Sequence, residues 1–183
     1  MTQNRYVLLD RDGVINEDSD HFIKSPEEWR PISGSLAAIA LLSTSGFKVV
    51  VITNQSGIAR GLFDPPMLER IHQKMLRLVA ENGGHIEAIY FCPHGPEDDC
   101  DCRKPKAGLL RAFAVEHRAD LHDAVLVGDS LRDIQAAEAV GVRPILVKTG
   151  KGQKTLNANP NLEIPVFDNL YDAAKSLVSG QEF

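Results

Sequence analysis

Short, uninterrupted apolar runs alternate with segments of helical period along most of this chain. The apolar runs are rich in valine, isoleucine and leucine, and we expect strands at 6–10, 48–53, 85–91, 124–129 and 143–148, with a weaker strand at 166–167. Their lack of polar alternation is typical of strands that are covered on both faces. The intervening segments predict helices at 33–45, 64–82, 107–119 and 131–140, and a further helix that begins near 168. This order predicts an α/β fold with a doubly wound, Rossmann-like parallel sheet.

The length and composition fit one globular domain. The 183 residues are 43% hydrophobic and 25% charged, so we expect a single domain over 1–183 rather than a disordered or fibrous chain. The Gly-, Asn- and Pro-rich stretch 150–165 predicts a long surface loop. The second strand and the next helix are too close in sequence for a large cap domain between them.

Charge and hydropathy exclude several classes of protein. The net charge of -5 opposes a nucleic-acid-binding surface, and no apolar run approaches the ~18 residues of a membrane span. The N-terminal sequence MTQNRYVLLD has neither the apolar run nor the cleavage site of a signal peptide. We therefore expect a cytoplasmic protein with reduced thiols that binds neither nucleic acid nor membrane.

Acidic and hydroxyl side chains follow three of the predicted strands. Asp10 and Asp12 end the first strand in DRDGVIN, Thr53 ends the second in TNQSG, and Asp129 ends the fourth in GDSLRD. Each alone has an ordinary explanation: an Asp-Gly turn, loop composition or a helix cap. Together, at the sheet edge where such folds bind ligands, and with the cationic RKPK segment at 103–106, they predict a metal-assisted phosphoryl-transfer site.

All three cysteines lie in one short stretch, FCPHGPEDDCDCRKP. Cys92, His94, Cys100 and Cys102 offer three thiolates and one imidazole, a ligand set for a closed, tetrahedral Zn²⁺ site. Four protein ligands leave no position for substrate, so the 92–102 loop predicts a structural zinc that pins the cations after it. The alternatives are a Cys92–Cys100 or Cys92–Cys102 disulfide with one spare thiol, or a redox thiol; the odd count and the expected compartment oppose a disulfide.

The segments DRDGVIN, VITNQSG, RKPK and VGDSLRD resemble the four motifs of the haloacid-dehalogenase-like phosphatases. More narrowly, TNQSGIARG and the CPH…CDCRKP loop resemble the D-glycero-D-manno-heptose-1,7-bisphosphate 7-phosphatase branch, over roughly residues 5–150. The resemblance implies a Mg²⁺-dependent hydrolase of a sugar bisphosphate, in nucleotide-activated heptose and lipopolysaccharide core biosynthesis. It also implies a monomer.

The same resemblance implies a role for each matching residue. Asp10 is the expected nucleophile that forms an aspartyl phosphate, and Asp12 is the expected general acid and then base, which keeps its proton at the first step. The implied Mg²⁺ ligands are Asp10, the Asp12 backbone carbonyl and Asp129. Thr53 and Lys104 are expected to bind the phosphoryl group, with Lys106 as the alternative lysine. The implied substrate contacts are Asp18, Ser19, Asp20, His21, Asn54, Gln55, Ser56, Gly57 and Arg103.

Two other functions stay open from the sequence. A histidinol-phosphate phosphatase can share the zinc-loop spacing, although SGIARG after TNQ and the absence of a fused second enzyme favour the heptose branch. A non-catalytic, zinc-stabilised binding module could keep the fold, but it has no chemical need for Asp10, Asp12, Thr53, Lys104 and Asp129 together.

Overall fold

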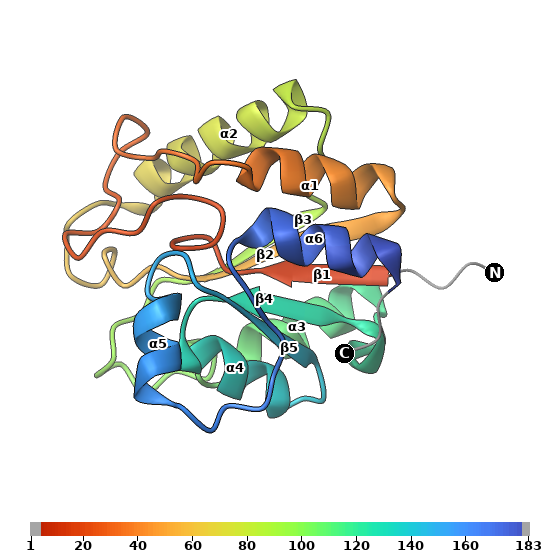
Figure 1. The fold of residues 1–183 in the computed structure, drawn as a ribbon. Helices are drawn as coiled ribbons and strands as arrows, with labels where there is room; N and C mark the ends of the chain where they lie inside the picture. The colour runs from red at the N-terminus through yellow and green to blue at the C-terminus, as the bar shows by residue number, and fades with distance from the viewer. Residues whose placement is uncertain (1–4, 181–183) are drawn as a thin grey trace.

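The computed structural model describes residues 5–180, and its strands form one fully parallel sheet (Figure 1). The order in the sheet is β3-β2-β1-β4-β5-β6. The strands are β1 (Arg5–Leu9), β2 (Phe47–Asn54), β3 (Ala88–Cys92), β4 (Val125–Gly128), β5 (Arg143–Val147) and β6 (Val166–Phe167). Strands β1 to β3 follow one another toward one edge of the sheet, and β4 to β6 follow one another toward the other edge, so the topological switch point lies between β1 and β4. The crevice at such a point is the usual ligand site of a doubly wound fold. The predicted fold class is confirmed.

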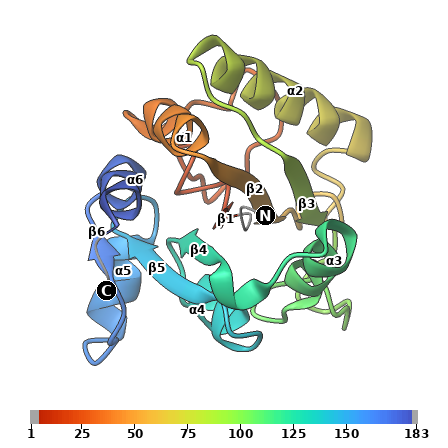
Figure 2. The same ribbon diagram turned by 90° about the vertical axis from the view of Figure 1, so that its right-hand side faces the viewer.

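Helices cover both faces of the sheet (Figure 2). They are α1 (Ser35–Thr44), α2 (Pro65–Glu81), α3 (Gly108–His117), α4 (Leu131–Glu138), α5 (Gly152–Ala158) and α6 (Leu170–Ser179). Helices α1, α2 and α6 lie on one face, and α3 and α4 lie on the other. No helix within residues 5–180 is both long and apolar enough to cross a membrane.

Each central strand supplies side chains to two separate cores. In β1, Val7 and Leu9 pack with the α1, α2 and α6 side, whereas Tyr6 and Leu8 pack with the α3 and α4 side. Consecutive residues of a strand point to opposite faces, and here both faces are covered by an apolar core. These residues of the strand are therefore all apolar, without polar alternation. This two-sided burial explains why the strand positions were predictable from the sequence.

The prediction of a long surface loop over 150–165 is wrong in part, because residues Gly152–Ala158 form α5. This helix has only seven residues, and glycine, threonine and asparagine are among them, so its own helical tendency is low. Two contacts with Asp129 anchor it: the Lys151 backbone N–H donates to Asp129 Oδ2 at 2.7 Å, and Thr155 Oγ1 donates to the Asp129 carbonyl at 2.9 Å. Tertiary contacts, which local composition does not report, therefore decide the conformation here.

Candidate active site

The ends of β1, β2 and β4 surround a cavity of about 330 Å³ at the crevice of the sheet. Asp10 and Asp12 follow β1, Asn54 ends β2, and Asp129 follows β4; all four line the cavity. The parallel register of the three strands brings these ends together, and the Asp10 backbone N–H donates to the Val127 carbonyl at 3.0 Å. The predicted convergence of the three strand ends is present.

Lys104 lies at the centre of this site. Its Nζ is 3.0 Å from Asp10 Oδ1 and 2.6 Å from Asp133 Oδ1, and it donates to the Ile52 carbonyl at 2.7 Å. The residue is only 2% exposed. Burial alone would lower the pKa of Lys104, but the carboxylates of Asp10 and Asp133 raise it above its usual value, so the ammonium stays charged.

Lys106, the alternative lysine, lies on the surface. Its Nζ is 3.0 Å from Asp99 Oδ1, and the Asp99 side chain is almost fully exposed. Lys106 is not among the residues that line the cavity around Asp10. Of the two lysines in RKPK, Lys104 has the geometry to reach a group bound at Asp10.

Asn54 fixes the backbone of Lys104. Its Nδ2 donates to the Lys104 carbonyl and its Oδ1 accepts from the Lys104 N–H, both at 3.1 Å. The predicted role of Asn54 was a substrate contact. The structure adds a second role: the Asn54 amide links the end of β2 to Lys104, which follows the zinc-binding loop.

Asp12 is held by a ring of donors. Arg11 Nη2 donates to both carboxylate oxygens, at 3.0 and 3.2 Å, Asn16 Nδ2 donates to Oδ1 at 2.9 Å, and Gln55 Nε2 donates to Oδ2 at 2.8 Å. Burial alone would raise the pKa of Asp12, but Arg11 and these hydrogen bonds lower it below its usual value. The expected proton on Asp12 is therefore disfavoured in the substrate-free site, because the donors stabilise the carboxylate.

Three carboxylates gather beside Lys104 in a group that fits a divalent cation. Oxygen atoms of Asp10, Asp129 and Asp133 all lie within 4.8 Å of one another. Burial and then the neighbouring acidic groups raise the pKa of Asp129 to about 7, and burial with its acidic neighbours also raises the pKa of Asp10 despite Lys104. Lys104 offsets only part of the mutual repulsion of these carboxylates, and carboxylate oxygens are the ligands that a hard cation such as Mg²⁺ prefers.

The backbone around this group leaves no room for other side chains. A Cβ atom on Gly13 would collide with the Asp129 carboxylate, and Gly13 has a φ of 83°, which glycine adopts most readily. A Cβ atom on Gly150 would meet the same carboxylate and the Gly13 backbone. The two glycines let the loops after β1 and β5 pack directly against Asp129.

Asp133 both binds Lys104 and begins α4. Its Oδ2 accepts from the Ser130 N–H at 3.1 Å, as part of a capping box, and also from Ser130 Oγ at 2.7 Å. The helix N-terminus therefore fixes one carboxylate oxygen of Asp133, and Lys104 is bound by the other. Asp133 therefore belongs to the site as well as to the helix.

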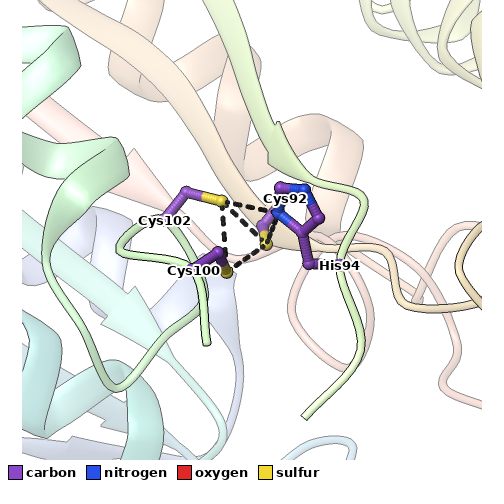
Figure 3. A group of neighbouring side chains, drawn as sticks. All are labelled: Cys92, His94, Cys100 and Cys102. Atoms are coloured by element: carbon purple, nitrogen blue, oxygen red, sulfur yellow. Dashed lines mark hydrogen bonds between the residues drawn. The ribbon is translucent and has the colours of Figure 1, made fainter. Parts of the chain in front are cut away.

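The cysteine loop folds into a compact metal-binding group (Figure 3). Cys102 Sγ lies 3.0 Å from Cys92 Sγ, 3.5 Å from Cys100 Sγ and 3.3 Å from His94 Nδ1, and all four donor atoms lie within 4.8 Å of one another. The cysteines are unpaired, so the alternative of a disulfide is wrong. Four donors at these separations can share one ion at about 2.0–2.3 Å from each, the arrangement of a structural Zn²⁺ site.

Most of the predicted substrate contacts line the cavity. Two do not: His21 is exposed and Gly57 is buried under Phe63. Thr53, which was predicted to bind the phosphoryl group, is also outside the lining; it is buried, and its hydroxyl accepts from Gln55 Nε2 at 3.0 Å. The predicted contacts that line it are Asp18, Ser19, Asp20, Asn54, Gln55, Ser56 and Arg103.

Sequence reasoning missed Lys151 and Arg132, which also line the cavity. Lys151 Nζ is 3.0 Å from Asp18 Oδ2 and 3.7 Å from Asp20 Oδ1, so it holds the segment after β1. Lys151 lies shortly after the end of β5. Because ligands bind at the carboxyl ends of parallel strands, inspecting the residues after this strand as well would have found it. Arg132 lies on the first turn of α4, where only the structure shows which way it points.

Three guanidinium groups meet at the cavity wall. Arg60, Arg103 and Arg132 all line it, and none of them forms an ion pair with another residue in 5–180. Burial and then the positive charge of Arg132 lower the pKa of Arg103 from its usual value. Uncompensated positive charge in a polar cavity is suited to a strongly anionic ligand.

Comparison with known proteins gives matches over nearly the whole chain. The HAD-hydrolase-like family matches residues 101–173. The D-glycero-beta-D-manno-heptose-1,7-bisphosphate 7-phosphatase of Pseudomonas putida is 52% identical over 95% of this chain and 99% of its own, and that of Neisseria meningitidis serogroup A is 48% identical over 95% of each. The D,D-heptose 1,7-bisphosphate phosphatase of B. bronchiseptica, whose crystal structure holds magnesium and phosphate, superimposes with a TM-score of 0.94 at 49% identity, over 97% of this chain and 99% of that one.

The Cys/His group generates a prediction on metal content. Replacing Cys102, the thiol nearest to the other three donors, leaves an incomplete ligand set. The Cys102→Ser protein should contain much less than one zinc per chain and melt at a lower temperature, because ligand binding to the folded state contributes to its stability. Metal analysis and thermal unfolding check this. Lys106→Met, a change in the adjacent RKPK segment outside the ligand set, is the control; equal zinc content in Cys102→Ser and wild type would contradict the assignment.

Proposed function

Because this chain belongs to the D-glycero-beta-D-manno-heptose-1,7-bisphosphate 7-phosphatase family of HAD-like hydrolases, we propose that it removes the 7-phosphate of that sugar through an aspartyl phosphate on Asp10. The observation that carries the proposal is the position of Asp10, which lines the cavity beside the charged Lys104 and close to the carboxylates of Asp129 and Asp133. A nucleophile in phosphoryl transfer needs position and charge neutralisation more than basicity.

Asp10 attacks phosphorus in the first step. One of its carboxylate oxygens forms a bond to phosphorus, and the bond between phosphorus and the C7 oxygen of the sugar breaks. Lys104 would bind the non-bridging phosphoryl oxygens, and its ammonium offsets the charge that gathers on them. Thr53 is proposed as a second contact for these oxygens, although its side chain is buried outside the cavity lining. Mg²⁺, held by Asp10, Asp129 and the Asp12 backbone carbonyl, would supply further positive charge to both the nucleophile and the phosphoryl group.

Asp12 moves the proton in both steps. It gives a proton to the departing sugar oxygen and then takes one from the water that hydrolyses the aspartyl phosphate. The donors around Asp12 lower its pKa and favour its carboxylate, so we propose that it gains its proton as the substrate binds. The approach of a phosphate dianion favours that change, because a nearby negative charge raises the pKa of a carboxyl group.

The cationic wall favours a bisphosphate over a monophosphate. Arg60, Arg103 and Arg132 lie on the cavity wall in addition to Lys104, and would pair with the second phosphate while the first is at Asp10. Histidinol phosphate has a single phosphate and an amine, so it would leave these guanidinium groups unpaired. The relatives from Pseudomonas putida and Neisseria meningitidis are named for the beta anomer, and we propose the same anomer for this chain.

All of the proposed catalytic and metal-binding residues come from one chain, which supports function as a monomer. The thiols of Cys92, Cys100 and Cys102 are unpaired and must be thiolates to bind zinc, which suits a reducing compartment. We therefore propose that the enzyme works in the cytoplasm.

A substrate panel tests the proposed function. We expect kcat/KM to be highest for D-glycero-beta-D-manno-heptose 1,7-bisphosphate, lower for its alpha anomer and fructose 1,6-bisphosphate, and lowest for histidinol phosphate. Phosphate release with Mg²⁺ present measures each value. A preference for histidinol phosphate would overturn the heptose assignment, and no phosphate release from any of the four would favour the non-catalytic binding module.

Substitution of the two aspartates tests their separate roles. Asp10→Asn should abolish turnover and Asp12→Asn should lower kcat by roughly 10²–10⁴-fold, the usual range for general acid–base catalysis. Circular dichroism should show normal folding in both. Retained turnover in folded Asp10→Asn would exclude Asp10 as the nucleophile, and full activity in Asp12→Asn would exclude Asp12 as the acid and base.

The two lysines of RKPK form a matched pair. Lys104→Met removes the ammonium beside Asp10 and should lower kcat on the order of 10²–10³-fold, as does removal of one group that stabilises transition-state charge. Lys106→Met removes a surface charge that pairs with Asp99 and should leave kcat close to wild type. Steady-state kinetics of both variants on the same substrate check this; a larger loss in Lys106→Met would reverse the assignment.

A further inference from the structure

We propose that His72 is a positioning residue for the phosphatase reaction: it holds Arg11, and Arg11 in turn fixes the Asp12 carboxylate toward the substrate. The inference rests on the proposed function, because it gives a role to two buried residues behind the acid and base of that reaction. His72 lies on α2, far in sequence from Asp12 and outside the cavity lining.

Arg11 is a fully buried cation that is paired with the Asp12 carboxylate. It is 0% exposed, and its Nη2 and Nε donate to Asp12 at 3.0 to 3.3 Å. Because Nη2 reaches both oxygens of Asp12, the flat guanidinium sets the rotation of the carboxylate as well as its position. Any rotation of Arg11 would therefore turn the oxygen that must face the sugar.

His72 completes the shell around Arg11. Arg11 Nη1 lies 3.2 Å from His72 Nε2, and His72 is only 4% exposed. A guanidinium has donors and no acceptor, so Nε2 must be the acceptor and the ring must carry its proton on Nδ1. His72 is therefore neutral, and burial together with Arg11 lowers its pKa to about 3. Because this acceptor is neutral, it binds Arg11 Nη1 without replacing Asp12 as the ion-pair partner of Arg11.

Helix α2 is a rigid support for this contact. Asp64 caps its first turn by accepting from the Met67 N–H at 2.9 Å, and the side of the helix that carries His72 is buried through Leu68, Ile71, Met75 and Val79. Lys74 Nζ donates to the Pro26 and Trp29 carbonyls at 2.6 and 2.8 Å, which ties the helix to the segment that follows the substrate-reading residues. The position of α2 therefore affects that of Asp12 through the side chains of His72 and Arg11.

A general acid is needed more when the leaving group is more basic. Comparing two leaving groups can therefore distinguish a misplaced Asp12 from a general loss of packing. A sugar alkoxide must be protonated as it leaves, whereas p-nitrophenolate is stable without a proton. A misplaced Asp12 should therefore slow the release of an alkyl group more than the release of p-nitrophenolate. General loss of packing would lower both rates alike.

The experiment compares kcat/KM for heptose 1,7-bisphosphate and for p-nitrophenyl phosphate in wild type, His72→Met and His72→Gln. Methionine removes the acceptor, and glutamine places an amide oxygen near the position of Nε2. We expect His72→Met to lose about tenfold on the bisphosphate, less than the roughly 10²–10⁴-fold that acid–base catalysis contributes in full, because Asp12 is displaced and not removed. The loss should fall on kcat rather than KM and be clearly smaller on p-nitrophenyl phosphate. His72→Gln should recover most of it.

Val79→Ala is the matched control, because Val79 is buried on the same helix and its loss should lower the melting temperature without changing the ratio between the two substrates. Should His72→Met fail to fold, Arg11→Lys serves instead: it keeps the charge, cannot bridge Asp12 and His72, and should give the same substrate-dependent loss. Equal losses on both substrates, or no recovery in folded His72→Gln, would overturn the inference. Wild-type activity on the bisphosphate reports on the proposed function separately, and fructose 1,6-bisphosphate provides a second alkyl phosphate for the ratio.

Discussion

The ammonium group of Lys104 lies between Asp10 and Asp133, at 3.0 and 2.6 Å, in a position that is almost closed to water. Three carboxylates lie together at this point of the sheet, and the buried ion pairs with Lys104 offset part of their repulsion. The same ammonium faces the oxygens of a phosphoryl group bound at Asp10. The neighbouring strand ends, the N-terminus of α4 and the zinc loop can all be understood as means of holding this one charge in place.

The zinc loop acts on the site through the chain that follows it. Cys92 is the last residue of β3 and Cys102 lies two residues before Lys104, so an ion shared by these thiols fixes both ends of the loop. Asn54 then binds the Lys104 backbone from the end of β2. Structural zinc binding contributes roughly 10–16 kcal/mol in small peptides, so a fraction of that is enough to order a loop. The cysteines therefore serve as a support, and the residues that follow them belong to the reaction.

The predictable part of the fold is the part fixed by two-sided burial. Strands such as β1 bury alternate side chains in two different cores, so continuous apolar runs locate the sheet, and the sheet locates the strand-end residues Asp10, Asp12 and Asp129. Helix α5 was missed because its contacts with Asp129, rather than its own sequence, hold it. Arg11 and His72 were missed for a similar reason, since nothing in the local sequence shows that they meet.

The protonation of Asp12 could not be predicted from the sequence either, because it depends on donors from Arg11, Asn16 and Gln55 that converge only in the folded chain.

The central claim is that zinc binding positions Lys104 for catalysis, and kinetics of the zinc-free protein test it most directly. Removing the zinc with a chelator and then restoring Mg²⁺ should lower kcat/KM on the order of 10²-fold, the scale of losing one charge-stabilising group, and adding zinc back should restore it. A folded, zinc-free protein with unchanged kcat/KM would contradict the account.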